Sequence, residues 1–270
     1  MLSILTLNIG AASSRRAELI LEWLSGRPED VFILTETSAG DGTRLLLDRF
    51  RGAGYSIVAH HNHDGDRGVA LVSRVQIETD LVEGMVDVTI PIRVAGAVIR
   101  SDPPTTVLGL YVPSRDASLE KVEKKHLFID SVLAAVRRMS SSSIATTVVG
   151  GDYNVIPRHH RPLHPGYLDF EFGFLDELER LGLTDAQAHV APNEQVYSWV
   201  GRTGAGYKYD YFHAGPTIVS MIERVEYISA SRELGFTDHS AVSLEISGIT
   251  CEPLSVCSPL EPAGQQASLF

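Results

Sequence analysis

The sequence predicts a layered α/β sandwich, and two features of the chain predict it. Apolar runs of strand length alternate with stretches of helical periodicity through the first half, and strand-like runs continue towards the C-terminal part. The alternation lacks the regular period of about 30 residues that successive βαβ units would show. Many strands with helices between and among them therefore favour packed sheets covered by helices.

The first 50 residues predict two buried strands, each followed by a helix. The strands are the apolar runs 2–9 and 30–37. The helices are 15–24 and 42–50. The first helix carries apolar residues at positions i, i+3, i+4 and i+7, which are Ala17, Ile20, Leu21 and Leu24.

The middle of the chain is rich in predicted strands. Two of them, 54–61 and 67–74, flank the polar loop HNHDGD, and 105–113 is another. The run MVDVTIPIRV, 85–94, alternates apolar and polar residues and is also predicted as a strand. Pro91 on its outward face indicates an edge strand or a bulge, because proline cannot donate to a strand ladder.

The second half begins with the longest predicted helix, 118–139, which leads into the apolar strand 144–149. A short acidic helix is expected at 172–181, and the last strands are expected near 209–212, 225–229 and 241–246. From about Ser247 the chain is rich in Pro, Ser and Gly and has no periodicity. We therefore expect one folded domain over 1–247 and a flexible tail over 248–270.

The composition limits the function only loosely. The chain has 270 residues, 44% of them hydrophobic, and a net charge of −11. A net negative charge disfavours a polyanionic partner, but a bound divalent cation reverses the local field where it binds. Only Cys251 and Cys257 occur, so a disulfide framework and a Cys-rich zinc site are not expected. We predict a cytoplasmic monomer without a membrane-spanning segment.

The stretch GGDYNVIP places Asp152 and Asn154 two residues apart at the exit of a predicted strand. Because a strand alternates its faces, the two side chains are expected to point the same way. The glycines before them permit a tight turn or close approach to a ligand. Asp and Asn also favour ordinary turns, so this stretch alone is compatible with either a site or a turn.

Polar residues of catalytic type recur at the ends of several other predicted strands. Each one alone also fits a turn, a cap or the core, but the joint pattern of carboxylates, amide, phenol and imidazole favours an active site. These residues are Asn8, Glu36, Tyr111, Asp210, Asp238 and His239.

In order and spacing, these segments resemble the exonuclease/endonuclease/phosphatase superfamily, and most of all its exonuclease III branch of DNA-repair nucleases. The resemblance spans residues 2 to about 245, and GGDYNVIP and GVALVSR are its most branch-specific parts. It implies a four-layer, deoxyribonuclease I-like α/β sandwich of two packed mixed sheets flanked by helices, with the site at one edge. The matching segments are LTLNIG, ILTET, GVALVSR, GLYVP, VVGGDYNVIP, LGLTDA, YSW, KYDYF and FTDHSAV.

The resemblance implies a metal-dependent DNA phosphodiesterase. Glu36 would be the principal ligand of Mg²⁺, with Mn²⁺ as the alternative ion. Asn8 and Asp238 would lie nearby, either as ligands or as hydrogen-bonding neighbours of ligands. Hard Mg²⁺ prefers oxygen donors and keeps several waters, so one or two carboxylates suffice to hold it.

The resemblance also assigns catalytic roles. Asp152 would orient or deprotonate the attacking water, and Asn154 would fix that water by hydrogen bonding. His239 would donate to the phosphate oxygens as charge builds, with Asp210 holding the imidazole tautomer. Tyr111 would contact the scissile phosphate.

Several departures from the branch pattern leave recognition of abasic sites open. After Asn8 the chain has Ile-Gly in place of an Asn-Gly-Arg-like continuation. No departure removes a catalytic group. The remaining ones are Thr35 for the usual Gln, Ser38 for Lys, Ser114 for Asn and Thr237 for Ser.

Candidate substrate contacts are less specific. Trp199 fits an aromatic wall for a flipped sugar and fits a core position equally well. Arg67 and Arg158 are candidate phosphate contacts, and exposed loops explain both as well. The histidines of HHNHD, 60–64, lack a Cys or a spaced partner, so a solvated loop is favoured over a zinc site.

The chain ends in QASLF, which resembles the bacterial sliding-clamp-binding pentapeptide. Its matching positions are Gln266, Leu269 and Phe270. Two large apolar side chains at the end of a flexible tether suit insertion into a preformed pocket. The sequence therefore predicts DNA and a sliding clamp as partners.

DNA is the predicted substrate, attacked as a 3′ exonuclease, as an abasic-site endonuclease, or as both. A phosphoesterase of the same fold acting on RNA or small phosphoesters is the alternative, favoured by the net charge of −11 and by Ser38 in place of Lys. An inactive clamp-binding scaffold ranks last, because all eight catalytic-type positions hold competent groups.

Overall fold

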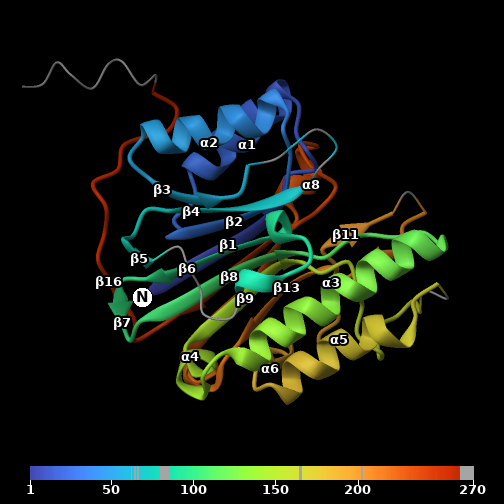
Figure 1. Ribbon diagram of the computed structural model, residues 1–270. Helices are drawn as coiled ribbons and strands as arrows, with labels where there is room; N and C mark the ends of the chain where they lie inside the picture. The colour runs from blue at the N-terminus through green and yellow to red at the C-terminus, as the bar shows by residue number, and fades with distance from the viewer. Residues whose placement is uncertain are drawn as a thin grey trace, which may run out of the picture.

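The computed structural model describes residues 1–61, 63, 65, 67–79, 85–163, 166–201 and 203–261, and it shows four layers (Figure 1). Two six-stranded sheets pack face to face, and helices cover the outer face of each. The predicted four-layer α/β sandwich is therefore confirmed.

Sheet one has the strand order β14-β15-β1-β2-β4-β3. β1 and β2 are parallel, and the other neighbours are antiparallel. Its strands are β1 (Leu2–Asn8), β2 (Val31–Thr37), β3 (Ser56–Ala59), β4 (Gly68–Ser73), β14 (Ile222–Ile228) and β15 (Ala241–Ile246).

Sheet two has the strand order β10-β13-β9-β8-β6-β5, with β8 and β9 parallel. Its strands are β5 (Ile77–Thr79), β6 (Val94–Ile99), β8 (Thr105–Tyr111), β9 (Thr147–Asp152), β10 (Thr184–Asp185) and β13 (Asp210–Ala214). The two-residue strands β11 (Trp199–Val200) and β12 (Gly206–Tyr207) form a small separate ladder.

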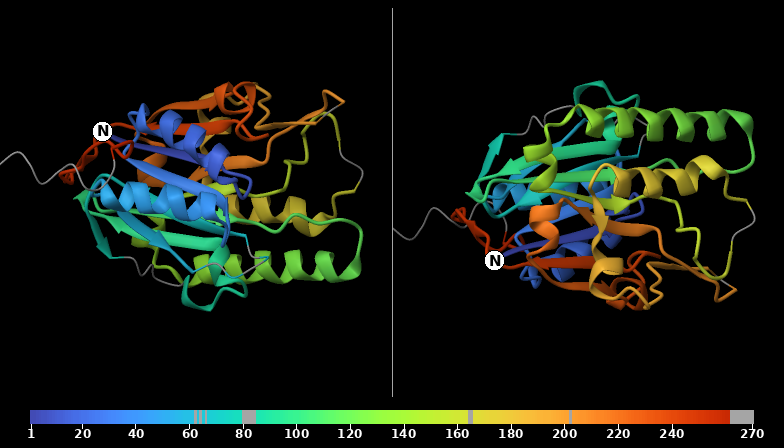
Figure 2. Two further views of the ribbon diagram at one scale, coloured as in Figure 1. Left: turned by 90° about the horizontal axis from the view of Figure 1, so that it is seen from above. Right: turned by 90° about the horizontal axis from the view of Figure 1, so that it is seen from below.

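Helices α1 (Ser14–Ser25) and α2 (Asp41–Gly52) cover sheet one. The predicted stripe of α1 is its buried face. Helices α3 (Leu119–Arg138) and α5 (Asp169–Arg180) lie side by side over sheet two (Figure 2). The short helices are α4 (Ser141–Ala145), α6 (Ala186–Val190), α7 (Pro216–Val219) and α8 (Ala230–Glu233).

Three apolar clusters separate the layers: one between the sheets, one under α1 and α2, and one under α3 and α5. Gly109 and Gly150, paired across β8 and β9, lie at the interface between the sheets. A Cβ on Gly109 would lie 2.7 Å from Ile33 Cγ2 of sheet one, and one on Gly150 would lie 3.1 Å from Ile33 Cδ1. These glycines therefore let the sheets approach closely just before the strand ends.

The strand predicted over 85–94 is wrong. The chain forms two single-turn 3₁₀ helices, η1 (Met85–Asp87) and η2 (Pro91–Arg93), before β6 begins at Val94. Pro91 is the first residue of η2, where a missing N–H costs no hydrogen bond. The alternation of apolar residues reflects packing of these turns, with Val88 buried against α3.

The chain still pairs with the rest of the domain beyond residue 247, where the folded domain was predicted to end. β16 (Thr250–Cys251) pairs with β7 (Ser101–Asp102), and Pro253 bridges Val75. Further along, the N–H of Cys257 donates to the carbonyl of Ala53 at 2.9 Å. Backbone pairing thus fixes the segment over at least 249–257, while residues 262–270 of the predicted tail lie outside the described residues.

No helix in the described part of the chain is long and apolar enough to cross a membrane.

Candidate active site

Three polar side chains lie in a row at the ends of neighbouring strands of sheet two. Tyr111 ends β8, Asp152 ends β9 and Asp210 begins β13. The strand register pairs Tyr111 with Asp152 and Asp152 with Asp210. Directly paired residues of adjacent strands point to the same face. Tyr111 belongs to the core between the sheets, so the row faces sheet one, and all three residues are buried.

Asn8, at the end of β1, connects this row to sheet one. Its Nδ2 donates to Asp152 Oδ2 at 2.9 Å and to Glu36 Oε1 at 3.1 Å, while its Oδ1 accepts from the N–H of Gly10 at 2.8 Å. Asn8 therefore presents its amide nitrogen to both carboxylates. In this orientation Asn8 is a hydrogen-bonding neighbour of Glu36 and Asp152 and orients both carboxyl groups.

His239 comes from the loop before β15 and lies against Asp210. Its Nδ1 is 2.7 Å from Asp210 Oδ2, and its Nε2 is 3.5 Å from Asn8 Nδ2. The hydroxyl of Thr237 donates to the carbonyl of Asn8 at 2.6 Å and accepts from the N–H of His239 at 3.4 Å. The threonine hydroxyl thus joins the His239 loop to β1.

The GGDYNVIP stretch forms both a turn and part of this site. Gly151 has φ +135°, and a Cβ there would lie 2.0 Å from the carbonyl oxygen of Leu110, so only glycine fits. Asn154 has φ +50°, and its N–H donates to Asp152 Oδ1 at 2.9 Å. The turn therefore sets the orientation of the Asp152 carboxylate, whose two oxygens accept from Asn154 and Asn8.

An irregularity in β2 sets the direction of the Glu36 side chain. It has φ +55°, and the register of β2 against β4 shifts between Thr35 and Thr37. Such a bulge re-aims a side chain at a sheet edge, and the left-handed backbone of a non-glycine residue is strained. The Glu36 side chain is 26% exposed, and its Oε2 is 4.0 Å from Arg67 Nε.

A pocket of about 510 Å³ opens beside these residues and is lined by Glu36, Asp238 and His239. Asp238 is exposed, and its Oδ2 accepts from Trp199 Nε1 at 2.9 Å. The backbone of Trp199 also forms an isolated antiparallel β-bridge with that of His239, and Trp199 is half-buried. The structure therefore brings Trp199 to the site and leaves part of its ring accessible.

Burial and mutual proximity change the protonation of the central groups. Burial raises the pKa of Asp152 to about 8; the Asp210 carboxylate adds to this rise and His239 opposes it. Burial lowers the pKa of His239, but Asp210, Asp152 and Asp238 together outweigh burial and raise the pKa to about 10. Burial, reinforced by Glu36 and Asp152, raises the pKa of Tyr111. His239 is therefore an imidazolium at neutral pH.

We name Glu36, Asp152, Asp210 and His239 the carboxylate cluster. Three carboxyl groups face one imidazolium here, and Asp210 Oδ1 is buried without a hydrogen-bond partner. An excess of carboxylate oxygens fits a hard divalent cation. Glu36 and Asp238 reach the open pocket, whereas the atoms of Asp152 and His239 that face the interior are engaged by Asn8, Asn154 and Asp210.

Arg93 is a residue at this site that the sequence reasoning missed. Its guanidinium lies 4.3 Å from the centre of the Tyr111 ring, and its NH1 donates to the Tyr111 carbonyl at 3.4 Å. Burial lowers the pKa of Arg93, although Tyr111, Glu36 and Asp152 oppose that effect. The only signal in the sequence was an arginine after Pro91, inside a run interpreted as a strand.

Arg158 contacts helix α5 rather than the carboxylate cluster. Its guanidinium pairs with Asp176 at 3.1 Å and with Asp169 at 3.5 Å, and it lies over the ring of Phe172. These partners belong to α5, so the structure assigns Arg158 a contact with that helix.

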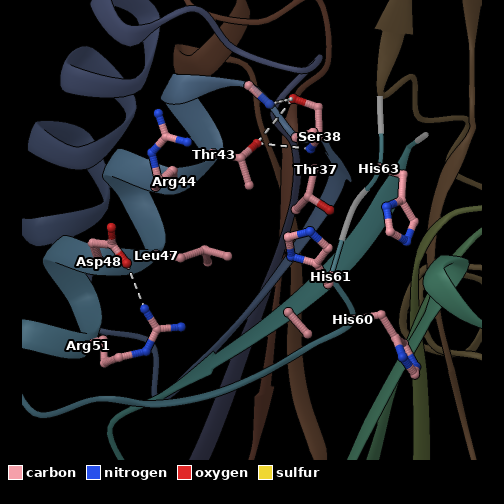
Figure 3. A pocket seen from close by; sticks show the side chains of 13 residues that line it. Thr37, Ser38, Thr43, Arg44, Leu47, Asp48, Arg51, His60, His61 and His63 are labelled. Atoms are coloured by element: carbon pink, nitrogen blue, oxygen red, sulfur yellow. Dashed lines mark hydrogen bonds and ion pairs between the residues drawn. The ribbon is translucent and has the colours of Figure 1, made fainter. Parts of the chain in front are cut away.

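The histidines of the polar loop line another pocket, of about 560 Å³, between α2 and the β3–β4 connection (Figure 3). His60, His61 and His63 face Arg44 and Arg51 across it. Among the described residues, the one group of three or more His, Cys, Asp or Glu close enough to share a metal is Asp152, Asp210 and His239. The described loop histidines belong to no such group.

A family model and several solved structures resemble this chain. The family model of the endonuclease/exonuclease/phosphatase family matches residues 5–239. The chain belongs to this family. Its members include hydrolytic enzymes, and the matched range contains every residue of the carboxylate cluster. No curated protein sequence matches the chain.

Solved structures share the fold at low sequence identity. An AP endonuclease from Archaeoglobus fulgidus superposes with a TM-score of 0.77 at 22% identity, covering 92% of this chain and 100% of that one. The 3′ phosphatase NExo from Neisseria, bound to a product DNA hairpin, gives 0.78 at 22% identity, with 92% and 100% coverage. The 3′-5′ exonuclease NExo from Neisseria meningitidis gives 0.74 at 22% identity, with 91% and 99% coverage.

Proposed function

We propose that the protein is a Mg²⁺-dependent DNA phosphodiesterase of DNA repair, acting as a 3′ exonuclease, as an abasic-site endonuclease, or as both. The observation that carries this proposal is the carboxylate cluster: a buried carboxylate, Asp152, lies beside an Asp210–His239 ion pair at the edge of an open pocket. General base, charged hydrogen-bond donor and cation-binding oxygens are the groups that phosphodiester hydrolysis requires.

Glu36 and Asp238 would hold the cation, which would supply Lewis-acid stabilisation of the phosphate charge. Asp152 accepts the proton of the attacking water through a carboxylate that Asn8 and Asn154 orient at 2.9 Å each. The amide of Asn154 positions the same water. Because burial raises the pKa of Asp152 to about 8, its carboxylate is basic enough to accept a proton near neutral pH.

His239 stabilises the developing negative charge as a hydrogen-bond donor. Asp210 holds its Nδ1 at 2.7 Å, which leaves Nε2 for the phosphate oxygen. The guanidinium of Arg93 over the Tyr111 ring adds a positive charge to the same side of the site. Trp199 and Arg67, at the margin of the pocket, would contact the sugar and the phosphate backbone.

DNA is favoured as the substrate by the solved structures that share the fold. One is an AP endonuclease, and another is bound to a product DNA hairpin. The second candidate is a hydrolase of RNA or small phosphoesters with the same chemistry, and the net charge of −11 favours its small-phosphoester form, because such substrates need no contacts along a phosphate backbone.

Cleavage of three end-labelled substrates in Mg²⁺, Mn²⁺ and chelator separates these possibilities. The substrates are blunt duplex DNA, the same duplex with one abasic-site analogue, and single-stranded DNA. A ladder from the 3′ end identifies an exonuclease, and a single cut at the lesion identifies an abasic endonuclease. Absence of metal-dependent cleavage of all three would contradict the DNA proposal and direct the assay to RNA and small phosphoesters.

We further propose that Gln266, Leu269 and Phe270 bind a sliding clamp and so raise the local concentration of the enzyme at DNA. Deletion of 266–270 should abolish clamp binding and leave hydrolysis of short oligonucleotides unchanged. Unchanged affinity for the clamp would remove this part of the proposal. The free thiols of Cys251 and Cys257 support the proposed cytoplasmic location.

A further inference from the structure

A second group of buried charges lies between the helices that cover sheet two. Lys125 belongs to α3, Glu171 to α5 and Arg115 to the loop after β8. The Lys125 and Glu171 side chains are each 1% exposed, and that of Arg115 is 9% exposed. We name these three residues the lysine cluster. Charges buried this deeply require partners inside the protein.

Glu171 is the centre of the lysine cluster, and both of its carboxylate oxygens are engaged. Lys125 Nζ donates to Oε1 at 2.6 Å. Arg115 NH2 and the N–H of Leu168 donate to Oε2, the latter at 2.8 Å. Two cations therefore share one carboxylate, which leaves one positive charge in excess.

The ammonium group of Lys125 contacts the proposed catalytic turn, which carries Asp152 and Asn154. Lys125 Nζ donates to the carbonyl of Asn154 at 2.7 Å. The N–H of Asn154 donates to Asp152 Oδ1, and its Nδ2 donates to the carbonyl of Val112 at 3.0 Å. With these three groups fixed, Oδ1 is the one polar atom of Asn154 without a hydrogen bond to any described residue.

We propose that Lys125 is a positioning residue for hydrolysis. Its ammonium, held in place by Glu171, fixes the Asn154 carbonyl in a left-handed backbone conformation and so aims the Asn154 amide at the attacking water. This inference rests on the proposed function, because it assigns Asn154 a part in the reaction. It connects α3 and α5 to the chemistry through a single backbone carbonyl.

A role in stability alone accounts less well for a buried lysine here. Burial lowers the pKa of Lys125, because removing the charged ammonium from water is unfavourable. Replacement by methionine keeps most of the volume and leaves Arg115 and Glu171 as a neutral pair. Apolar replacement of a whole buried ion pair is often neutral or stabilising, whereas removal of one partner is destabilising when it leaves the other charge unpaired. Here Glu171 keeps Arg115 as its counter-ion, so methionine removes the donor to the Asn154 carbonyl and to Glu171 Oε1.

The first test compares Lys125→Met with Lys121→Met. Lys121 lies one turn earlier on α3, is 55% exposed and pairs with Asp116, so it provides the same substitution without contact to Asn154. For Lys125→Met we expect kcat to fall about 10- to 100-fold with KM changed by less than about threefold. The kcat of both variants should be measured well below their melting temperatures, because Lys125→Met leaves two buried acceptors without a donor and lowers stability. Equal kcat values for the two variants would overturn the inference.

A double-mutant cycle with Asn154→Ala tests whether Lys125 acts through Asn154. In the Asn154→Ala background, Lys125→Met should lower kcat by less than about twofold, because the group that it positions is gone. An undiminished loss in that background would show that Lys125 acts elsewhere and would overturn the inference.

Amide hydrogen exchange provides a readout that does not need activity. Exchange of the peptide 150–157 should accelerate in Lys125→Met and stay unchanged in Lys121→Met, because the carbonyl that anchors the turn is released. Unchanged exchange in both variants overturns the inference whether or not the protein cleaves DNA. Absence of DNA cleavage by the wild type, with accelerated exchange in Lys125→Met, counts against the proposed function alone.

Discussion

The carboxylate cluster and the lysine cluster both lie close to the ends of β8 and β9, and they differ in how their charges are balanced. In the lysine cluster, each oxygen of Glu171 is paired with a cation inside the chain. In the carboxylate cluster, three carboxyl groups face one imidazolium, and Asp210 Oδ1 is buried without a partner. The lysine cluster has the opposite imbalance, one positive charge in excess with Arg115 Nε buried without a partner, whereas a divalent cation from outside would balance the carboxyl groups of the carboxylate cluster.

This difference separates groups that hold geometry from groups that perform chemistry. In the lysine cluster, apolar replacement of the excess cation leaves a balanced Arg115–Glu171 pair. In the carboxylate cluster, the excess of buried carboxyl groups is unfavourable for folding and is typical of a site that a ligand or a reaction uses. Substitutions in the two clusters are therefore expected to act on different observables, and the predictions below separate them.

The largest effect is expected for Asp152→Asn in the carboxylate cluster. Asparagine keeps the shape but cannot accept the proton of water, so turnover should fall by about 10²- to 10⁴-fold. The melting temperature should be unchanged or higher, because a buried carboxylate beside Asp210 is removed. Steady-state cleavage and thermal unfolding measure the two quantities. Near-normal turnover would exclude Asp152 as the base.

The opposite behaviour is expected for Glu171→Gln in the lysine cluster. This change leaves Lys125 and Arg115 as two buried cations without a carboxylate, which should cost about 3–5 kcal/mol in the free energy of unfolding. Urea denaturation of Glu171→Gln, with the exposed Glu120→Gln on α3 as a matched control, measures this loss. A loss below about 1 kcal/mol would mean that the two clusters do not differ as described.

A smaller effect on turnover is expected for His239→Gln. Glutamine retains a hydrogen-bond donor but not the positive charge, so kcat should fall about 10²-fold. Asp210→Asn should give a comparable loss, because it leaves the imidazole without the carboxylate that raises its pKa to about 10. If kcat of the double variant His239→Gln/Asp210→Asn falls no further than kcat of either single variant, the two residues act as a unit.

The smallest effect expected here is the dependence of cleavage activity on pH. Asp152 accepts a proton only when it is ionised, and its pKa is raised to about 8, so activity should rise about tenfold per pH unit below 8 and then level off. His239 keeps its proton up to about pH 10, so no decline is expected before about pH 9.5. A flat profile of kcat/KM between pH 6 and 8 would contradict the role of Asp152.

The sequence predicted those parts of the molecule that local patterns specify. The buried strands that carry Asn8, Glu36, Tyr111 and Asp152 at or next to their last residue follow from continuous apolar runs, and α1 follows from its stripe. Because polar residues followed these runs, the members of the carboxylate cluster could be named in advance.

What the sequence could not predict depends on contacts distant along the chain. β16 is two residues long and is defined by its pairing with β7, about 150 residues earlier. Lys125 occurs in the charged stretch EKVEKK, and only the position of α3 against α5 shows that it is buried. Arg93 was hidden by an alternating pattern that Pro91 turned into a 3₁₀ helix.

The central claim, that the carboxylate cluster is completed by a divalent cation, is tested most directly by Mn²⁺ binding followed by electron paramagnetic resonance. Wild-type protein, Glu36→Gln and the control Asp48→Asn, an exposed carboxylate on α2, would be titrated side by side. We predict that Glu36→Gln weakens binding at least about tenfold while Asp48→Asn binds as the wild type does. Equal Mn²⁺ affinity in Glu36→Gln and the wild type would contradict the account.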